Sequence, residues 1–258
     1  MSLTGKSPSE TYKDIAYVDN GNNGVTTSLK QVKTGNGSST ALQVSDRSLQ
    51  VKSATNNTTA LDVQNASGTS KLLVDTTNNY VKANGVHVNT QYAHFGVATG
   101  ALQSAVANTH YAIPFNRTFQ QDIVAIGTGT NPDTSFTISS TADDIVLCYW
   151  YIMDNITIDR VVWWSGADAS SGDTTRCHLQ SFTIDSGNGS TSGDLSSGVV
   201  LADGADITNA GYEQAYYQQM TIQSSDVSAG KVVLFTFRSD SVNSDFAINA
   251  TIKYHITG

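Results

Sequence analysis

The sequence contains little that would build a disulfide-rich or helical protein. It has two cysteines, three prolines and three methionines in 258 residues, and only 14% of its residues are charged. Two cysteines cannot form a disulfide framework, and because Cys148 and Cys177 lie in apolar runs we expect buried free thiols. Strong helix formers are scarce, whereas β-branched and turn-forming residues dominate. The composition therefore predicts an all-β protein.

Long apolar runs are also absent. No stretch of eighteen apolar residues occurs, so we expect no membrane-spanning segment and no membrane partner. Residues 1–6 lack the apolar core of a signal peptide. We therefore expect the protein to be made in a cytoplasm.

Charge and aromatic residues divide the chain into two regions. Residues 1–100 carry eight Lys and Arg against six Asp and Glu, whereas residues 101–258 carry six against sixteen. The second region also holds all three Trp residues. It lacks the clustered cations that bind phosphates, which argues against nucleic acid as a partner.

Catalytic, cofactor and metal motifs are not found, and we predict none of these sites. No two of the five His residues have metal-ligand spacing, and neither a serine nucleophile elbow nor a phosphate loop occurs. Glycoside hydrolysis needs two carboxylates in a cleft, yet Glu213 is the only Glu after residue 10. The stretch 185–190 has ligand chemistry that suits Ca²⁺, but an ordinary turn is the favoured interpretation.

Residues 1–24 form a polar leader that we expect to anchor the protein. Its few apolar side chains, Tyr12, Ile15 and Tyr17, cannot make a core of their own. Such a segment is either frayed or ordered by docking on a larger partner.

Residues 25–90 repeat a short Leu-x-Val strand followed by a polar turn. Thr40–Val44 recurs nineteen positions later as Thr59–Val63. So short a region with so few aromatics cannot close a core alone. We expect a homotrimeric β shaft, with a monomeric extended linker as the alternative. The residues predicted to divide between the three-fold interior and strand contacts are Leu42, Val44, Leu61, Val63, Leu72 and Val74. His87 could then face the three-fold axis and bind an ion, although a structural role is favoured.

Residues 91–110 are expected to form a neck with a short helical turn, and residues 111–258 a β-sandwich or jelly-roll head. The continuous apolar run 145–153 predicts a central strand buried on both faces. Alternation predicts one shared face for Val233, Phe235 and Phe237, and another for the even positions 248–256. The other expected strands are 112–115, 122–127, 135–139, 156–164, 177–184, 198–201 and 215–223.

Adjacent aromatics are the most suggestive feature of the head. Trp163 and Trp164 must point to opposite faces of one strand, so both cannot enter the same core. The exposed member lies at an interface or forms a platform for a sugar. Together with Tyr212 and the turns 165–173, 185–194 and 203–213, it is the predicted receptor contact.

Several stretches resemble fibre-like virion proteins of tailed, especially marine, bacteriophages. The leader 3–14, the run 34–44, the shaft-like run 74–79 and the closing strands 235–240 and 250–254 carry the resemblance. It implies a homotrimeric fibre in the virion, anchored through residues 1–24 to another virion protein, with a β-rich head outward.

Three functions are consistent with these features. The leading one is attachment to a host-surface glycan or protein without enzymatic activity. The second is a purely structural head-decoration or tail-connector role. The third, a polysaccharide-degrading tailspike, is less favoured, because the chain has no room for a long β-helix.

Overall fold

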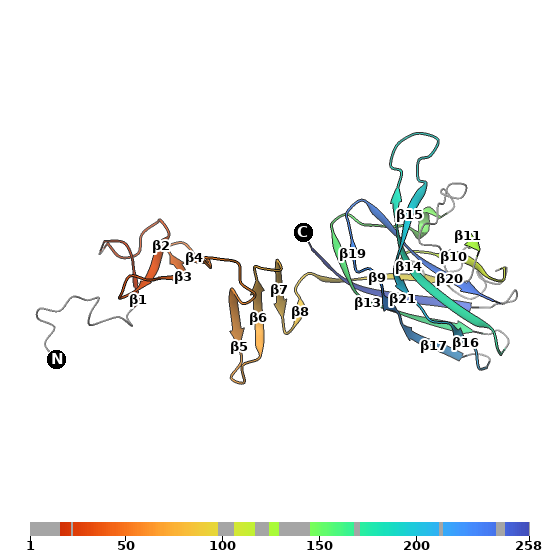
Figure 1. The fold of residues 1–258 in the computed structure, drawn as a ribbon, viewed down its shortest axis with the longest axis horizontal. Coiled ribbons are helices and arrows are strands. Elements are labelled where there is room, and N and C mark those ends of the chain that lie inside the picture. The colour runs from red at the N-terminus through yellow and green to blue at the C-terminus, as the bar shows by residue number, and fades with distance from the viewer. Residues whose placement is uncertain are drawn as a thin grey trace, which may run out of the picture. The chain divides into compact units, whose positions relative to one another are not determined.

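The computed structural model describes residues 16–21, 23–97, 106–116, 124–128, 145–167, 171–211, 214–240 and 246–257. Strands dominate these residues, and their single helical element is a 3-10 turn at Val146–Cys148. The expected all-β class is confirmed. The chain divides into two units, Met1–Val88 and Asn89–Gly258, each with its own sheets (Figure 1).

Two small antiparallel sheets make up the described part of the first unit. In each sheet the strands follow chain order, β1-β2-β3-β4 and β5-β6-β7-β8. Their bounds are β1 (Ala16–Val18), β2 (Lys30–Thr34), β3 (Ser39–Val44), β4 (Leu49–Val51), β5 (Leu61–Gln64), β6 (Ser70–Asp75), β7 (Tyr80–Ala83) and β8 (Val86–His87). Each strand thus needs only a short connection to reach its partner.

Polar turns hold the second of these sheets in register. Asn84 (φ 50°) and Gly85 (φ 81°) both adopt left-handed backbone conformations between β7 and β8, as a tight two-residue hairpin turn requires. Between β5 and β6, the Asn65 side chain accepts hydrogen bonds from the backbone N–H groups of Ser67 and Thr69. A slip of one residue would move every Leu and Val to the other face, so these turns determine which face is apolar.

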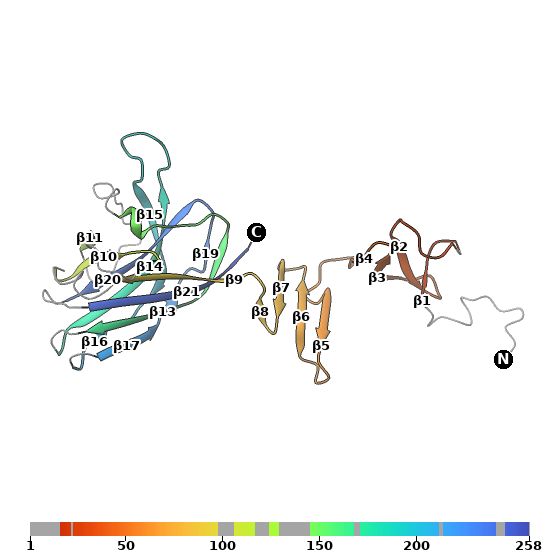
Figure 2. The same ribbon diagram turned by 180° about the vertical axis from the view of Figure 1, so that it is seen from behind.

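The second unit contains two larger open sheets. One has the order β11-β10-β20-β14-β15-β18, with β12 and β16 beside β20 and β14; the other has the order β17-β13-β21-β9, with β19 beside β13. The bounds are β9 (Thr90–Val97), β10 (Thr109–Ile113), β11 (Val124–Thr128), β12 (Trp150–Tyr151), β13 (Ile156–Ala167), β14 (Thr174–Ile184), β15 (Leu195–Asp203), β16 (Ile207–Thr208), β17 (Gln214–Gln219), β18 (Thr221–Ile222), β19 (Asp226–Val227), β20 (Lys231–Ser239) and β21 (Phe246–Ile256). Figures 1 and 2 both show β13 and β21 side by side, and the two strands pair along their length.

The main hydrophobic core of the second unit is shared by these two sheets. Phe95 and Trp163 enter it from the β17-β13-β21-β9 sheet, and Leu179 and Phe235 enter it from the other sheet. The predicted shared face of Val233, Phe235 and Phe237 is confirmed, as is that of Ile248, Ala250 and Ile252. Burying both sets of alternating side chains excludes water from the space between the sheets.

The predicted central strand at 145–153 is wrong. The segment forms a 3-10 turn and then the two-residue strand β12, which pairs with β20. Ile145 and Cys148 pack in a small second cluster with Val232 and Leu234, whereas Trp150 and Ile152 pack in the main core. The run is apolar because it crosses from one cluster to the other. β20 is buried on both faces along most of its length, as is the middle of β14.

The expected neck at 91–110 also differs from the structure. Residues 91–97 belong to β9, which pairs along its length with β21, and Thr109 begins β10. Ala93, Phe95 and Val97 alternate into the main core, so this segment is an integral strand of the second unit. The suggested helical turn falls largely on residues 98–105, outside the described residues.

The remaining strand predictions are largely confirmed. The predicted strand 135–139 lies outside the described residues. The predicted strand 215–223 is divided at buried Met220 into β17 and β18, which belong to different sheets. Both cysteines are free and buried, as expected.

Candidate functional site: uncovered apolar faces and an aromatic outer surface

The four predicted interface residues of β5 and β6 lie on one face of their sheet. Leu61 is directly opposite Val74, and Val63 is directly opposite Leu72, so their side chains share that face. The register continues to Val81 and Ala83 of β7. Leu61, Val63 and Leu72 are all exposed, with 48% of Val63 accessible. We call this surface the apolar shaft face.

The sheet β1–β4 repeats the arrangement. Leu42 is directly opposite Val51, and Val44 is directly opposite Leu49, so these four side chains also share one face. The other face carries Gln31 opposite Gln43, and the Gln43 amide donates to Gln31 Oε1 at 3.2 Å. The second face of the β5–β8 sheet carries Asp62, Leu73 and Lys82. Each sheet therefore has one mainly polar face and one apolar face with exposed side chains.

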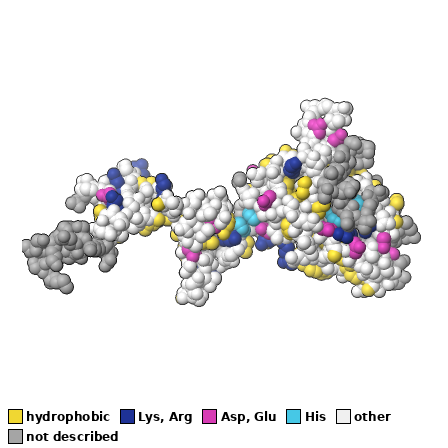
Figure 3. Space-filling view, viewed as in Figure 1, with side chains coloured by type: hydrophobic (Ala, Val, Ile, Leu, Met, Phe, Trp, Pro, Cys, Tyr) yellow, Lys and Arg dark blue, Asp and Glu magenta, His cyan; other side chains and the backbone are white. Residues whose placement is uncertain are grey.

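The first unit has no hydrophobic core within its described part. Among residues 16–21 and 23–88, no hydrophobic side chain is buried, and Asp75 is the one buried residue. Figure 3 shows hydrophobic side chains at the surface between the Lys and Arg residues of the β1–β4 sheet. Sheets of two to four strands need a covered apolar face for stability in water. Within the described part of the first unit, nothing buries these apolar faces.

The anchor prediction is only partly within the described residues. Tyr17, on β1, is exposed, and it pairs with Lys33 of β2. Tyr12 and Ile15 lie outside the described residues. The anchoring role of this segment stays a prediction.

The two adjacent tryptophans separate as their spacing predicts. Trp163 is fully buried, and its indole nitrogen donates to Gln218 Oε1 at 3.3 Å. Trp164 points outward with 48% of its surface accessible, and its ring lies 5.1 Å from that of Tyr217 on β17. Arg160 donates a hydrogen bond to the Tyr217 hydroxyl at 3.0 Å, which holds that ring in place. Tyr212 lies outside the described residues.

Trp164 belongs to a wider surface, which we call the outer face of the β17-β13-β21-β9 sheet. Trp164 lies between Tyr217 and Asn249, in the row of paired residues that crosses the sheet. The next row places Val162 between Gln219 and Thr251, with His94 beyond. The third row is Arg160, Lys253 and Tyr92. This surface combines exposed aromatic rings with uncharged hydrogen-bonding groups and, in the third row, the two cations Arg160 and Lys253.

Sequence reasoning missed Tyr92 as part of this surface. Its side chain is 60% exposed at the edge strand β9. The alternation of Ala93, Phe95 and Val97 was the signal that places Tyr92 outward. Residues 91–110 were interpreted as a neck, so the alternation in 92–97 was not used to predict a strand.

The predicted receptor loops are described in part. In the hairpin loop between β14 and β15, Asp185 Oδ1 accepts a hydrogen bond from the Gly187 N–H, and Oδ2 accepts one from the Thr191 hydroxyl. Both hydrogen bonds, that from Thr191 first, lower the pKa of Asp185. Both carboxylate oxygens thus serve the turn itself. Within the described part of the chain, no group of three or more His, Cys, Asp and Glu is placed to hold a metal ion.

A buried polar cluster lies on the larger sheet, on the face that points away from the main core. Arg176 donates to both oxygens of Asp203, and His178 Nε2 lies 2.8 Å from Asp203 Oδ1. Burial lowers the pKa of His178 to about 3, with further lowering by the neighbouring His110 and Arg176. Arg238 lies 3.9 Å from Asp206, which also approaches Arg176. Each guanidinium has a carboxylate partner, so the cluster joins β14, β15 and β20 and leaves no unpaired cation for a ligand.

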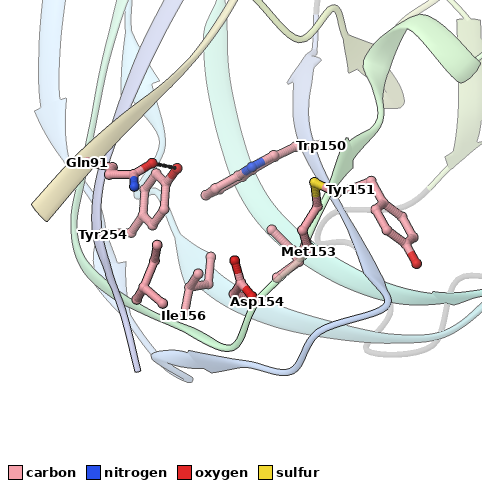
Figure 4. Close-up of a pocket in the computed structure, with 9 residues that line it drawn as sticks. Gln91, Trp150, Tyr151, Met153, Asp154, Ile156 and Tyr254 are labelled. Atoms are coloured by element: carbon pink, nitrogen blue, oxygen red, sulfur yellow. Dashed lines mark hydrogen bonds between the residues drawn. The ribbon is translucent and has the colours of Figure 1, made fainter. Parts of the chain in front are cut away.

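A half-open pocket lies at the opposite end of the β9–β21 pair from the Trp164 row. Its volume is about 250 Å³. Figure 4 shows Trp150, Met153, Asp154, Ile156 and Tyr254 around one hollow, with Tyr151 pointing away. Sequence reasoning did not identify this pocket, because its walls come from three segments that are distant in the chain.

Neither a protein-family model nor a curated protein matches this chain. Among the described residues, no helix has the length and apolarity needed to cross a membrane.

Proposed function

We propose that this protein is a homotrimeric fibre protein of a bacteriophage virion. Residues 1–24 would anchor it to another virion protein, residues 25–90 would form the β shaft, and the second unit would be a jelly-roll-like head that attaches to a host-surface glycan or protein. The observation that carries the proposal is the pair of uncovered apolar faces on the sheets β1–β4 and β5–β8. The phage assignment itself rests on the sequence resemblance.

Three copies suit these sheets geometrically. Each sheet is apolar on one face only, so three related sheets can turn those faces toward a common axis and keep their polar faces in water. Leu61, Val63, Leu72 and Val74 would then meet their equivalents in the other copies. Every copy supplies the cover that the other two lack, which explains why one chain has no core in this region.

The attachment role is supported by the outer face of the second unit. Trp164 and Tyr217 expose large aromatic surfaces on a rigid sheet, and aromatic faces stack on sugars and anchor protein interfaces. Asn249, Gln219 and Thr251 beside them can exchange hydrogen bonds with hydroxyl groups. Stacking on the Trp164 and Tyr217 rings needs no charge, which suits a region of net charge −10.

The mass and cell binding of the purified full chain test this proposal. Light scattering should give about three times the chain mass of 27.4 kDa, and the labelled protein should bind cells of the bacterium that the phage infects. A stable, folded monomer would contradict the proposed trimeric fibre. A trimer that binds no host cells, yet is present in virions, would favour the structural decoration or connector role instead.

A further inference from the structure

The pocket lined by Trp150 and Tyr254 has the features of a ligand site. Gln91 of β9, Tyr254 of β21, Trp150 of β12 and the segment 152–156 converge there. The Trp150 and Tyr254 rings lie 4.9 Å apart at an interplanar angle of 58°, and Ile156 adds a further apolar wall. Because Gln91, Tyr254 and Trp150 belong to paired strands and Ile156 belongs to the core, this side of the pocket is formed before any ligand arrives.

One polar group in the pocket is fixed by its neighbour. The Tyr254 hydroxyl donates to Gln91 Oε1 at 2.9 Å (Figure 4). Burial raises the pKa of Tyr254, so the hydroxyl stays protonated and keeps this bond. The bond leaves the amide nitrogen of Gln91 available as a donor.

The opposite side of the pocket carries an unpaired carboxylate and an uncovered apolar side chain. Asp154 is exposed, and it has no hydrogen-bond or ion-pair partner among the described residues. Met153, next to it, is 81% exposed. A carboxylate with both oxygens free can accept hydrogen bonds from two adjacent hydroxyl groups.

We propose that this pocket binds a neutral pyranose residue that has two adjacent free hydroxyl groups. The two hydroxyls would donate to the Asp154 oxygens, and a third ring substituent would accept from the Gln91 amide. The apolar C–H face of the sugar would pack against Trp150, Tyr254 and Met153. Asp154 is the only charged residue of the pocket lining, so an acidic sugar would meet an unpaired negative charge. This inference rests on the proposed attachment function for its choice of a glycan, and it adds a site distinct from the outer face.

Fluorine NMR of the full chain labelled with fluorotryptophan tests the pocket. The three resonances are assigned with single Trp→Phe variants, and methyl glucoside, methyl galactoside and methyl mannoside are the probes. At least one of the three should shift the Trp150 resonance in a saturable way, at concentrations of about 1 to 50 mM as expected for a single sugar. Trp163, which is fully buried, should not respond. A Trp164 response beside that of Trp150 would report separate binding on the outer face.

Matched variants locate the binding. Asp154→Asn should lower the affinity for the sugar by about tenfold or more, because a charged acceptor is lost. Met153→Ala should lower this affinity to a smaller extent. Asp226→Asn, the same change at a carboxylate outside the pocket on neighbouring β19, should leave the affinity unchanged. Circular dichroism should confirm that each variant is folded.

Four results would overturn the inference. The first is no shift at Trp150 with any of the three sugars, and the second is an unchanged sugar affinity in Asp154→Asn. The third is a Trp150 shift with cyclohexanol equal to that with the sugars. The fourth is that Met153 resists chemical oxidation in the trimer because a neighbouring copy covers it. A shift at Trp164 alone would exclude sugar binding in the pocket. It would place sugar binding on the outer face instead, which is consistent with the proposed attachment function. Loss of cell binding in Trp164→Ala with an intact Trp150 response would separate the two sites.

Discussion

Leu72 of β6 lies directly opposite Val63 of β5, and both side chains are exposed on a sheet whose unit has no buried hydrophobic residue among its described residues. Cross-strand pairs of this kind stabilise a sheet when their face is covered. Here the face that carries Val63 and Leu72 is exposed to solvent in the single chain. If the proposed shaft is correct, this pair would lie in the contact between chains.

Leu72→Asp should convert the protein to a monomer. In a trimer the change would place three carboxylates in an apolar contact, where an unpaired charge costs several kcal/mol. Light scattering should then give one chain mass. Lys71→Asp, one residue earlier, is the control and should remain trimeric, because Lys71 lines a hollow together with Leu73 and Lys82 of the other face. An unchanged trimer in Leu72→Asp would show that the apolar shaft face is not the contact.

The two adjacent tryptophans should differ sharply on substitution. Trp163→Ala removes a fully buried ring, so the free energy of unfolding should fall by about 3 to 5 kcal/mol. Trp164→Ala removes an exposed ring and should cost less than about 1 kcal/mol, while it lowers binding to host cells. Thermal unfolding and cell binding of both variants check this. Equal destabilisation by both would assign Trp164 to the core.

Acid should destabilise the fold through His178. Its pKa of about 3 in the folded protein lies below the ordinary value of 6.5, so the unfolded chain binds more protons between these limits. The stability contributed by the neutral imidazole is complete above pH 6.5 and is lost as the pH falls toward 3. At pH 4 the loss from this residue is about 3 kcal/mol. Urea unfolding at pH 7 and pH 4 should show it, and His178→Gln should lose less stability over the same interval.

Local alternation predicted the first unit and much of the second. The Leu-x-Val repeats placed the six shaft residues on sheet faces because side chains alternate along any strand. The same rule separated Trp163 from Trp164. These predictions needed only the order of residues within one strand, which the sequence contains directly.

The failures all involve contacts between distant segments. The run 145–153 is apolar because it touches two different clusters, and no local period distinguishes that case from a central strand. The pocket joins Gln91 to Tyr254 across 163 positions, so its existence depends on the pairing of β9 with β21. Sequence alone does not specify that pairing.

Gly204 provides a test of how tightly the predicted loop 203–213 is packed. A Cβ at this position would lie 2.9 Å from the carbonyl oxygen of Cys177 and 2.8 Å from Gln218 Oε1. The Gln218 side chain can move, although it accepts the Trp163 hydrogen bond, but the carbonyl belongs to the core strand β14 and cannot move freely. Gly204→Ala should therefore lower the free energy of unfolding by about 1 to 3 kcal/mol. Gly189→Ala, where a Cβ meets no atom within 4 Å, is the control, and its urea midpoint should match that of the wild type. Equal urea midpoints for all three proteins would mean that the loop can shift away from β14 with little loss of stability.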